Sequence, residues 1–240
     1  MSSDACLALR MQAPMQSWGV DSRFNRRNTA VMPSRSAVAG MLCASLGLNR
    51  GSSGEADFLK EFSSVKMVAV STQRIKETVP SVEDAFLDSV ADKANIPDKQ
   101  PIFHMKRMQD FHTVQGTVSA DGKALPNAVL TYRQYLNDAS FFAFLCGSRA
   151  LLKKIGDALQ DPVWGLWFGR KSCIPSAPVY AGIFPNLRDA ESALLQSLCV
   201  TTREEDCAVF SDGTDTRPDI PLNFCSSERA FGLRRVRRTY

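Results

Sequence analysis

The sequence predicts an α+β protein with a ferredoxin-like plan, in which a long β-hairpin is inserted between the second and third strands. Several short segments alternate apolar and polar residues at period two, which is typical of strands. Two further segments repeat their apolar residues at helical spacing, and the order along the chain is strand, helix, strand, long excursion, strand, helix, strand. That order is the split βαβ arrangement.

The first strand and helix are expected in the N-terminal fifth of the chain. Leu7, Leu9 and Met11 share one face, which predicts a half-buried strand over 6–11. A basic loop is expected to run on to Pro33, after which Ser34 can cap a helix that ends at Gly47. Gly40 within that helix predicts close packing of the helix on a sheet.

A second strand is expected over 65–71, covered on both faces. The looser pattern over 73–135 predicts a protruding hairpin that contains an acidic helix over 82–94. Strands over 128–136 and 140–146 are expected to pair around an Asn-Asp turn.

A second helix with Ser148 as its cap and a strand over 179–184 complete the plan. We therefore expect one domain over residues 1–186, with the excursion at about 73–135. A short helix over 189–198 and a β-rich extension over 187–240 are expected to pack on this domain.

Composition narrows the class of protein. The chain has 240 residues, 44% hydrophobic and 22% charged, which excludes disorder as its main state. It has no apolar run of about 18 residues and no signal-peptide pattern at its start, so a cytoplasmic protein without a membrane span is expected. The seven cysteines are odd in number and scattered, which predicts free thiols and insensitivity to reductant.

Charge is unevenly distributed along the sequence. Residues 1–50 hold six arginines against two aspartates, a net +4 that equals the charge of the whole chain. Residues 187–219 carry a net charge of −5, and the segment after residue 228 holds five arginines and no acid. This separation of charge favours a protein with one basic face for a polyanion and an acidic face for a different partner. The alternative is that these charges only form a solvated surface.

The first candidate site lies between the first strand and the first helix. Guanidinium groups and a helix N-terminus suit phosphate, and a tryptophan can stack on a base. The alternative is that the tryptophan is core and the arginines are solvated. The candidate residues are Gln16, Trp18, Arg23, Arg26, Arg27, Ser34 and Arg35.

Two further candidates follow. Gly169, Arg170, Lys171 and Ser172 combine a close-approach glycine with two cations, but they do not form an ATP-binding Walker sequence. His112, Thr113 and Gln115 lie in a polar stretch that could contact RNA or, with lysine and tyrosine, cleave it without metal; plain packing is the alternative. Metal-ligand spacings are absent from the sequence, so no metal or cofactor is expected.

Five motifs in one order resemble a known family: LRMQAPMQSWG (9–19), PSRSAVAGML (33–42), DFHTV (110–114), RQYLNDASF (133–141) and GRKSC (169–173). They are similar to the CasD family, the type I-E form of the fifth CRISPR-associated family, whose members are subunits of Cascade. The resemblance implies an RRM-like domain of the RAMP superfamily, with the excursion as its thumb.

The resemblance also implies a non-catalytic role. Such a subunit grips the 5′ handle of the CRISPR RNA and docks the Cascade backbone subunit and the large subunit that reads the protospacer-adjacent motif. Target DNA is met only indirectly, through the complex. The RNA contacts implied by the motifs are Gln16, Trp18, Arg35, His112, Thr113 and residues 169–172.

The alternative is a metal-independent endoribonuclease that processes CRISPR repeat RNA, as in the type I-C branch of the family. That activity would need His112, Lys171 and Tyr132 to lie together.

Overall fold

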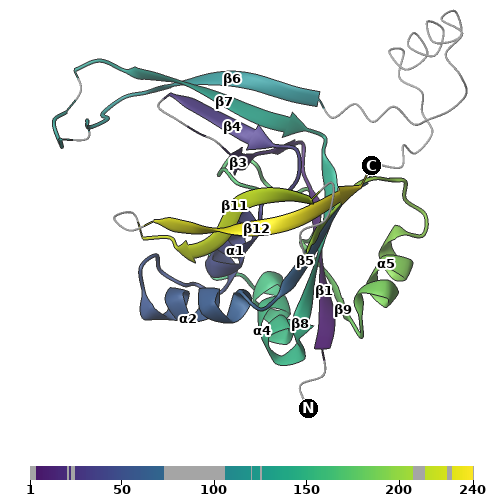
Figure 1. Cartoon of the computed structure of the whole chain (residues 1–240). Helices are drawn as coiled ribbons and strands as arrows, with labels where there is room; N and C mark the ends of the chain where they lie inside the picture. The colour runs from purple at the N-terminus through teal and green to yellow at the C-terminus, as the bar shows by residue number, and fades with distance from the viewer. Residues whose placement is uncertain are drawn as a thin grey trace, which may run out of the picture.

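The computed structural model describes residues 4–20, 22, 25–72, 106–119, 121–124, 126–207, 214–225 and 229–239. These residues form two β-sheets and four helices, which confirms the α+β class (Figure 1). The acidic helix expected over 82–94 and the candidate residue Arg23 lie outside the described residues.

The larger sheet has seven strands in the order β11-β12-β10-β5-β8-β1-β9. In the group β9-β1-β8-β5 each strand is antiparallel to its neighbour, so β1 and β5 run parallel with β8 between them. The strands are β1 (Asp4–Gln12), β5 (Lys66–Thr72), β8 (Ser140–Ser148), β9 (Tyr180–Phe184), β10 (Val200–Asp206), β11 (Thr214–Asn223) and β12 (Ala230–Thr239).

Strand β1 is buried on both faces, so the prediction of a half-buried strand is wrong. Leu7 and Leu9 belong to the main core, whereas Cys6 and Ala8 belong to a smaller cluster on the other face of the sheet. The reason is that β1 lies between β8 and β9, one strand in from the edge of the sheet, and both faces of the sheet there are covered by helices.

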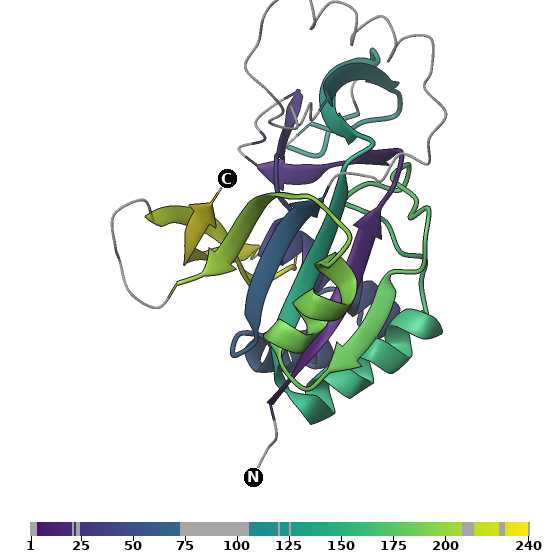
Figure 2. The same cartoon turned by 90° about the vertical axis from the view of Figure 1, so that its right-hand side faces the viewer.

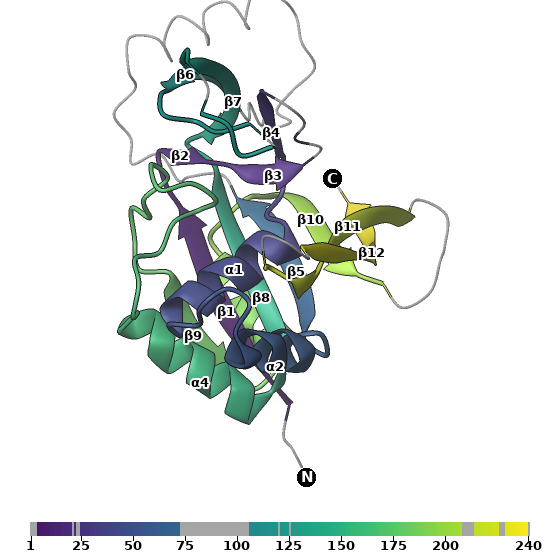
Figure 3. The same cartoon turned by 90° about the vertical axis from the view of Figure 1, so that its left-hand side faces the viewer.

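Helices α1 (Arg35–Ser45), α2 (Ser53–Phe62) and α4 (Arg149–Gln160) cover one face of this sheet (Figure 3). Helix α5 (Leu187–Leu195) covers the other face (Figure 2). Helix α2 was not expected from the sequence, although its large apolar residues Phe58, Leu59 and Phe62 are buried. Among the described residues, no helix is both long and apolar enough to cross a membrane.

The predicted ends of α1 are confirmed. The Ser34 hydroxyl accepts a hydrogen bond from the Ala37 N–H, and Gly47 takes a φ of 69°, which ends the helix. The reason expected for Gly40 is wrong: a Cβ there would meet only the Phe224 ring, at 3.9 Å, an ordinary contact. Gly40 instead lines a groove.

The second sheet has five strands, in which β7 pairs with β2, β4 and β6, and β4 also pairs with β3. Three of these strands occupy the segment expected to be a loop before Pro33. The strands are β2 (Met15–Gln16), β3 (Trp18–Val20), β4 (Arg26–Ala30), β6 (Lys106–Val114) and β7 (Val129–Asn137).

The expected pairing of the strands before and after residues 137–138 is wrong, because β7 and β8 belong to different sheets. Asp138 takes a φ of 51°, and its N–H donates to the Pro14 carbonyl at 3.0 Å. The chain therefore crosses from the second sheet to the first at this residue.

Candidate nucleic-acid interface

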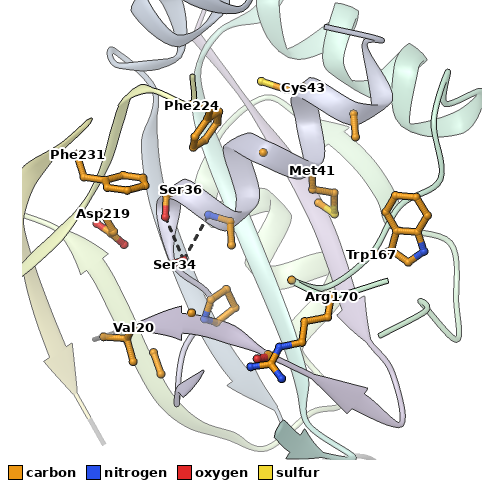
Figure 4. Close-up of a pocket in the computed structure, with 18 of the residues that line it drawn as sticks. Val20, Ser34, Ser36, Met41, Cys43, Trp167, Arg170, Asp219, Phe224 and Phe231 are labelled. Carbon is orange, nitrogen blue, oxygen red and sulfur yellow. Dashed lines mark hydrogen bonds between the residues drawn. The ribbon is translucent and has the colours of Figure 1, made fainter. Parts of the chain in front are cut away.

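A groove of about 1400 Å³ runs along α1. Helix α1 forms its floor, and its walls are the loop over 163–171, strands β3 and β4, and the β11–β12 hairpin (Figure 4). Its lining is rich in cationic and aromatic side chains: Arg27, Arg50, Arg170, Lys171, Arg217, Arg229, Arg238, Trp164, Trp167, Phe224 and Phe231.

Three acids also line the groove, but two of them are neutralised within the fold. Glu204 lies 2.5 Å from Arg238 and 3.1 Å from Arg234, and Asp219 lies 2.8 Å from Arg234. The third acid is Glu55, which is 2% exposed. The groove therefore presents a surplus of positive charge together with flat apolar rings, a combination that suits a single-stranded polyanion with bases.

Gly169 fixes the loop that carries two of these cations. It takes a φ of +94°, and a Cβ there would lie 1.7 Å from the Ser17 carbonyl oxygen. The loop docks at this point because the Ser17 N–H donates to the Phe168 carbonyl at 3.0 Å. No other residue type fits this approach, so glycine is what seats the loop against β3.

Arg170 and Lys171 follow directly at the rim of the groove. The Arg170 guanidinium stacks 4.6 Å from the centre of the Tyr135 ring, and its Nη2 donates to the Arg27 carbonyl at 3.0 Å. Lys171 is exposed, and its ammonium lies 6.0 Å from the centre of the Trp167 ring. This segment, residues 169–172, is called the Gly169 loop below; it holds Arg170 in a defined orientation and leaves Lys171 open to a phosphate.

The start of α1 does not offer a free anion site. Asp219 Oδ2 accepts from the Arg35 N–H at 2.8 Å, and Ser34 accepts from Ala37. A carboxylate of this chain therefore already occupies the position expected for a phosphate.

Arg35 is held inside the fold, which argues against the phosphate contact expected for it. It is 3% exposed, and its guanidinium donates to Asp206 at 2.9 Å and to the carbonyls of Phe62 and Val65 at 2.7 and 2.6 Å. Burial lowers the pKa of Arg35, and the neighbouring Asp206 opposes that shift. The side chain ties α1 to the end of α2 and to β5.

Gln16 and Trp18 are also buried. The Gln16 amide donates to the carbonyls of Met11 and Ala139 at 3.0 and 2.6 Å, which joins the two sheets. Trp18 is 1% exposed and packs edge-on against Phe141. The core interpretation of Trp18 is the one that fits, because its ring has no open face for a base.

The remaining sequence candidates lie on exposed elements. Arg26 and Arg27 are exposed on β4, and Arg27 lines the groove. Ser172 is exposed in the Gly169 loop, and Thr113 and Gln115 are exposed near the tip-side end of β6.

Two of the three residues required for cleavage, His112 and Tyr132, do not lie together. His112 lies opposite Thr131 in the β6–β7 ladder, whereas Tyr132 lies opposite Phe111, so His112 and Tyr132 point to opposite faces. The His112 Nε2 instead lies 3.0 Å from Asp110 and 3.3 Å from the Tyr135 hydroxyl. In the described part of the chain, no cluster of three His, Cys, Asp or Glu side chains could hold a metal ion.

The acidic segment and the arginine-rich end meet in one buried network rather than on separate faces. Arg234, which is 4% exposed, contacts Glu204, Asp206 and Asp219 at 2.8–3.1 Å, and Asp206 also contacts Arg35. Much of the charge asymmetry in the sequence is thus cancelled inside the molecule.

Sequence reasoning missed the β11–β12 wall of the groove and its aromatic residues Phe224 and Phe231. The alternation of exposed and buried residues in β12 marks a strand, but nothing local indicates that it faces α1.

Comparison with known proteins gives consistent matches. A family model described as CRISPR-associated protein (Cas_Cas5) matches residues 6–237. The Cascade subunit CasD of Escherichia coli (strain K12) is 28% identical over 194 residues, which is 79% of this chain and 75% of that protein.

Solved structures agree on the fold. A chain of a CRISPR RNA-guided surveillance complex superposes with a TM-score of 0.70 at 24% identity, covering 98% of this chain and 89% of that one. A crystal structure of a Cas protein gives a TM-score of 0.57 at 25% identity, covering 98% and 93%. Because the family model spans almost the whole chain, this protein belongs to the CRISPR-associated Cas5 family, as its sequence motifs predict.

Proposed function

We propose that this chain is a non-catalytic, RNA-binding subunit of a type I-E Cascade surveillance complex, and that its groove grips the 5′ handle of the CRISPR RNA. The similarity to a Cascade subunit supports the assembly, and the groove supports the ligand. CRISPR RNA, the backbone subunit and the large subunit are the partners, and target DNA is met through the complex.

The observation that carries this proposal is the Gly169 loop at the rim of the groove. It brings the backbone within contact of β3 and projects Lys171 outward beside Arg170 and Arg27. Cations neutralise phosphates without reading sequence, while Trp164 and Phe231 offer rings on which bases can stack. Such a site holds the backbone and shape of a fixed RNA segment.

We further assign β9-β1-β8-β5 with α1 and α4 to a ferredoxin-like, RAMP-type domain over residues 1–186. The antiparallel order of these strands supports that assignment. The β6–β7 hairpin is its thumb, and residues 187–240 are an extension whose β10 adds to the free edge of β5.

The non-catalytic role is favoured because His112 and Tyr132 lie on opposite faces of the hairpin. General acid-base cleavage requires both groups within hydrogen-bond reach of one phosphodiester and its 2′-hydroxyl. The separation of His112 from Tyr132 therefore favours RNA binding over the repeat-cutting alternative.

The test is binding of labelled CRISPR repeat RNA to the purified chain across a salt series in EDTA, read for retention and cleavage together. Lys171→Ala should weaken binding several-fold and reduce the slope of log affinity against log salt by about 0.7, the value for one phosphate contact on a single strand. Lys154→Ala is the matched control, because Lys154 is an exposed lysine on α4 outside the groove.

Equal affinity and slope in the Lys171 and Lys154 variants would refute the groove as the binding site. A discrete cut that His112→Ala abolishes would refute the non-catalytic role and favour the endoribonuclease.

A further inference from the structure

Two cysteines of the central sheet are in direct contact. Cys6 on β1 and Cys146 on β8 are partners in the antiparallel register, and their sulfur atoms lie 2.9 Å apart. Both are free thiols. The contact lies on the α5 side of the sheet, where Phe144, Leu187 and Ala190 pack around it.

The register supplies the Cα spacing that a disulfide requires. Directly opposed residues in antiparallel strands have Cα atoms about 4.5 or 5.5 Å apart, and both values lie inside the range that a disulfide spans. The sulfurs need to approach by only about 0.9 Å to reach a bond of about 2.05 Å. The two sulfurs are therefore already placed for oxidation by the pairing of β1 with β8.

The two thiols differ in access and in acidity. Cys6 is fully buried, whereas Cys146 is partly exposed at the edge of the cluster. The contact between the sulfurs lowers the pKa of Cys146 and outweighs the opposing effects of burial and Glu191, while the same contact and burial raise the pKa of Cys6. Cys146 is thus the thiol that ionises first and meets solvent first.

We propose that Cys6 and Cys146 form an oxidisable dithiol, a modification site at which a low-molecular-weight disulfide such as glutathione disulfide converts the pair into a cross-strand disulfide. The Cys146 thiolate attacks one sulfur of the oxidant and releases one thiolate, which takes up the Cys146 proton, leaving a mixed disulfide. The Cys6 sulfur then attacks Cys146, loses its proton and releases the second thiol. Two protein thiols are oxidised and one oxidant disulfide is reduced to two thiols.

This inference contradicts the insensitivity to reductant that the scattered cysteines predict. Position in the sheet, rather than spacing in the sequence, brings residues 6 and 146 together. The bond would close a loop of 140 residues and restrict the unfolded chain, so the oxidised form should melt on the order of 10 °C higher.

The test treats the purified full chain with glutathione disulfide under native conditions, alkylates it in denaturant without reductant, and maps the peptides by mass spectrometry. Wild type should lose two hydrogen atoms, yield a linked Cys6–Cys146 peptide, and show a Tm rise that dithiothreitol reverses. Cys6→Ser should stop at a glutathione adduct on Cys146, without the Tm rise. Cys43→Ser is the matched control, since Cys43 is a buried thiol elsewhere in the core, and it should behave like wild type.

Recovery of both cysteines as alkylated thiols, or linkage of either one to a different cysteine, would overturn the proposal. So would an unchanged Tm in fully linked protein, because the bond would then not act on this sheet. These readouts require no RNA, so their failure is separate from any failure of the proposed RNA binding.

Discussion

Replacement of Arg234 should uncouple the C-terminal hairpin from the rest of the fold. Its guanidinium donates to Asp219 twice at 2.8 Å, to Asp206 at 2.8 Å and to Glu204 at 3.1 Å, all in a region that is almost closed to solvent. Burial by itself lowers the pKa of Arg234, but the carboxylates outweigh it and the net shift is upward. The Arg234 side chain is therefore charged in the folded protein and neutralises carboxylates on the two strands β10 and β11.

The cost of Arg234→Met follows from what the substitution leaves behind. Removing one partner of a buried ion pair costs about 3–5 kcal/mol, because the other charge is left uncompensated. Here Asp206 keeps Arg35 and Glu204 keeps Arg238, so we expect the low end, about 3 kcal/mol. Methionine retains most of the apolar part of the arginine side chain, so the loss in free energy of unfolding measures the effect of the missing charge rather than of a change in volume.

The assay is equilibrium unfolding in urea, with Arg237→Met as the matched control on the same strand. Arg237 is 52% exposed and lies 3.9 Å from Glu205, so its loss should change the free energy of unfolding by less than about 1 kcal/mol. Equal destabilisation by the two substitutions would show that the buried network is not what anchors the hairpin.

Three other substitutions test the interface and the core. Gly169→Ala forces a Cβ onto the Ser17 carbonyl and should lower RNA affinity at least tenfold in a filter-binding assay; unchanged affinity would mean that the loop is not needed. Ser34→Ala removes the cap of α1 and should cost about 1 kcal/mol in urea unfolding, an effect that Ser34→Asp should largely restore. Burial, aided by the nearby Glu55 carboxylate, raises the pKa of Cys43 to about 12 from 9.0. The thiol of Cys43 therefore loses its proton at a lower pH in the unfolded chain than in the folded one. Stability should therefore fall between pH 9 and 12 by up to about 1.4 kcal/mol per unit, and Cys43→Ala should flatten that slope in unfolding measured at several pH values.

The elements that could be predicted from sequence are those with strong local signals. Period-two alternation located β1 and β5, and the Ser34 and Gly47 pair located both ends of α1. Helix α2 was missed because its apolar residues are few and its flanks are short and polar.

The candidate site was predicted less well than the fold, because the sequence shows which side chains are charged but not which groups they contact. Arg35 and Lys171 look alike as basic residues beside a glycine or a helix start, yet one is buried on Asp206 and the other is exposed at the groove. The partners of Arg35 are 27 to 184 residues away along the chain, beyond any local pattern.

The position of β1 between β8 and β9 has a consequence for synthesis of the chain. Its partners β8 and β9 begin 128 or more residues after Gln12, so at about 5–20 residues per second the ribosome needs roughly 6–25 s to deliver the first of them. For that interval an apolar strand has both hydrogen-bonding edges open, which is the condition for pairing with the wrong chain. Yield in a cell should therefore depend on how the nascent N-terminal segment is shielded, even though the finished protein buries most of this strand.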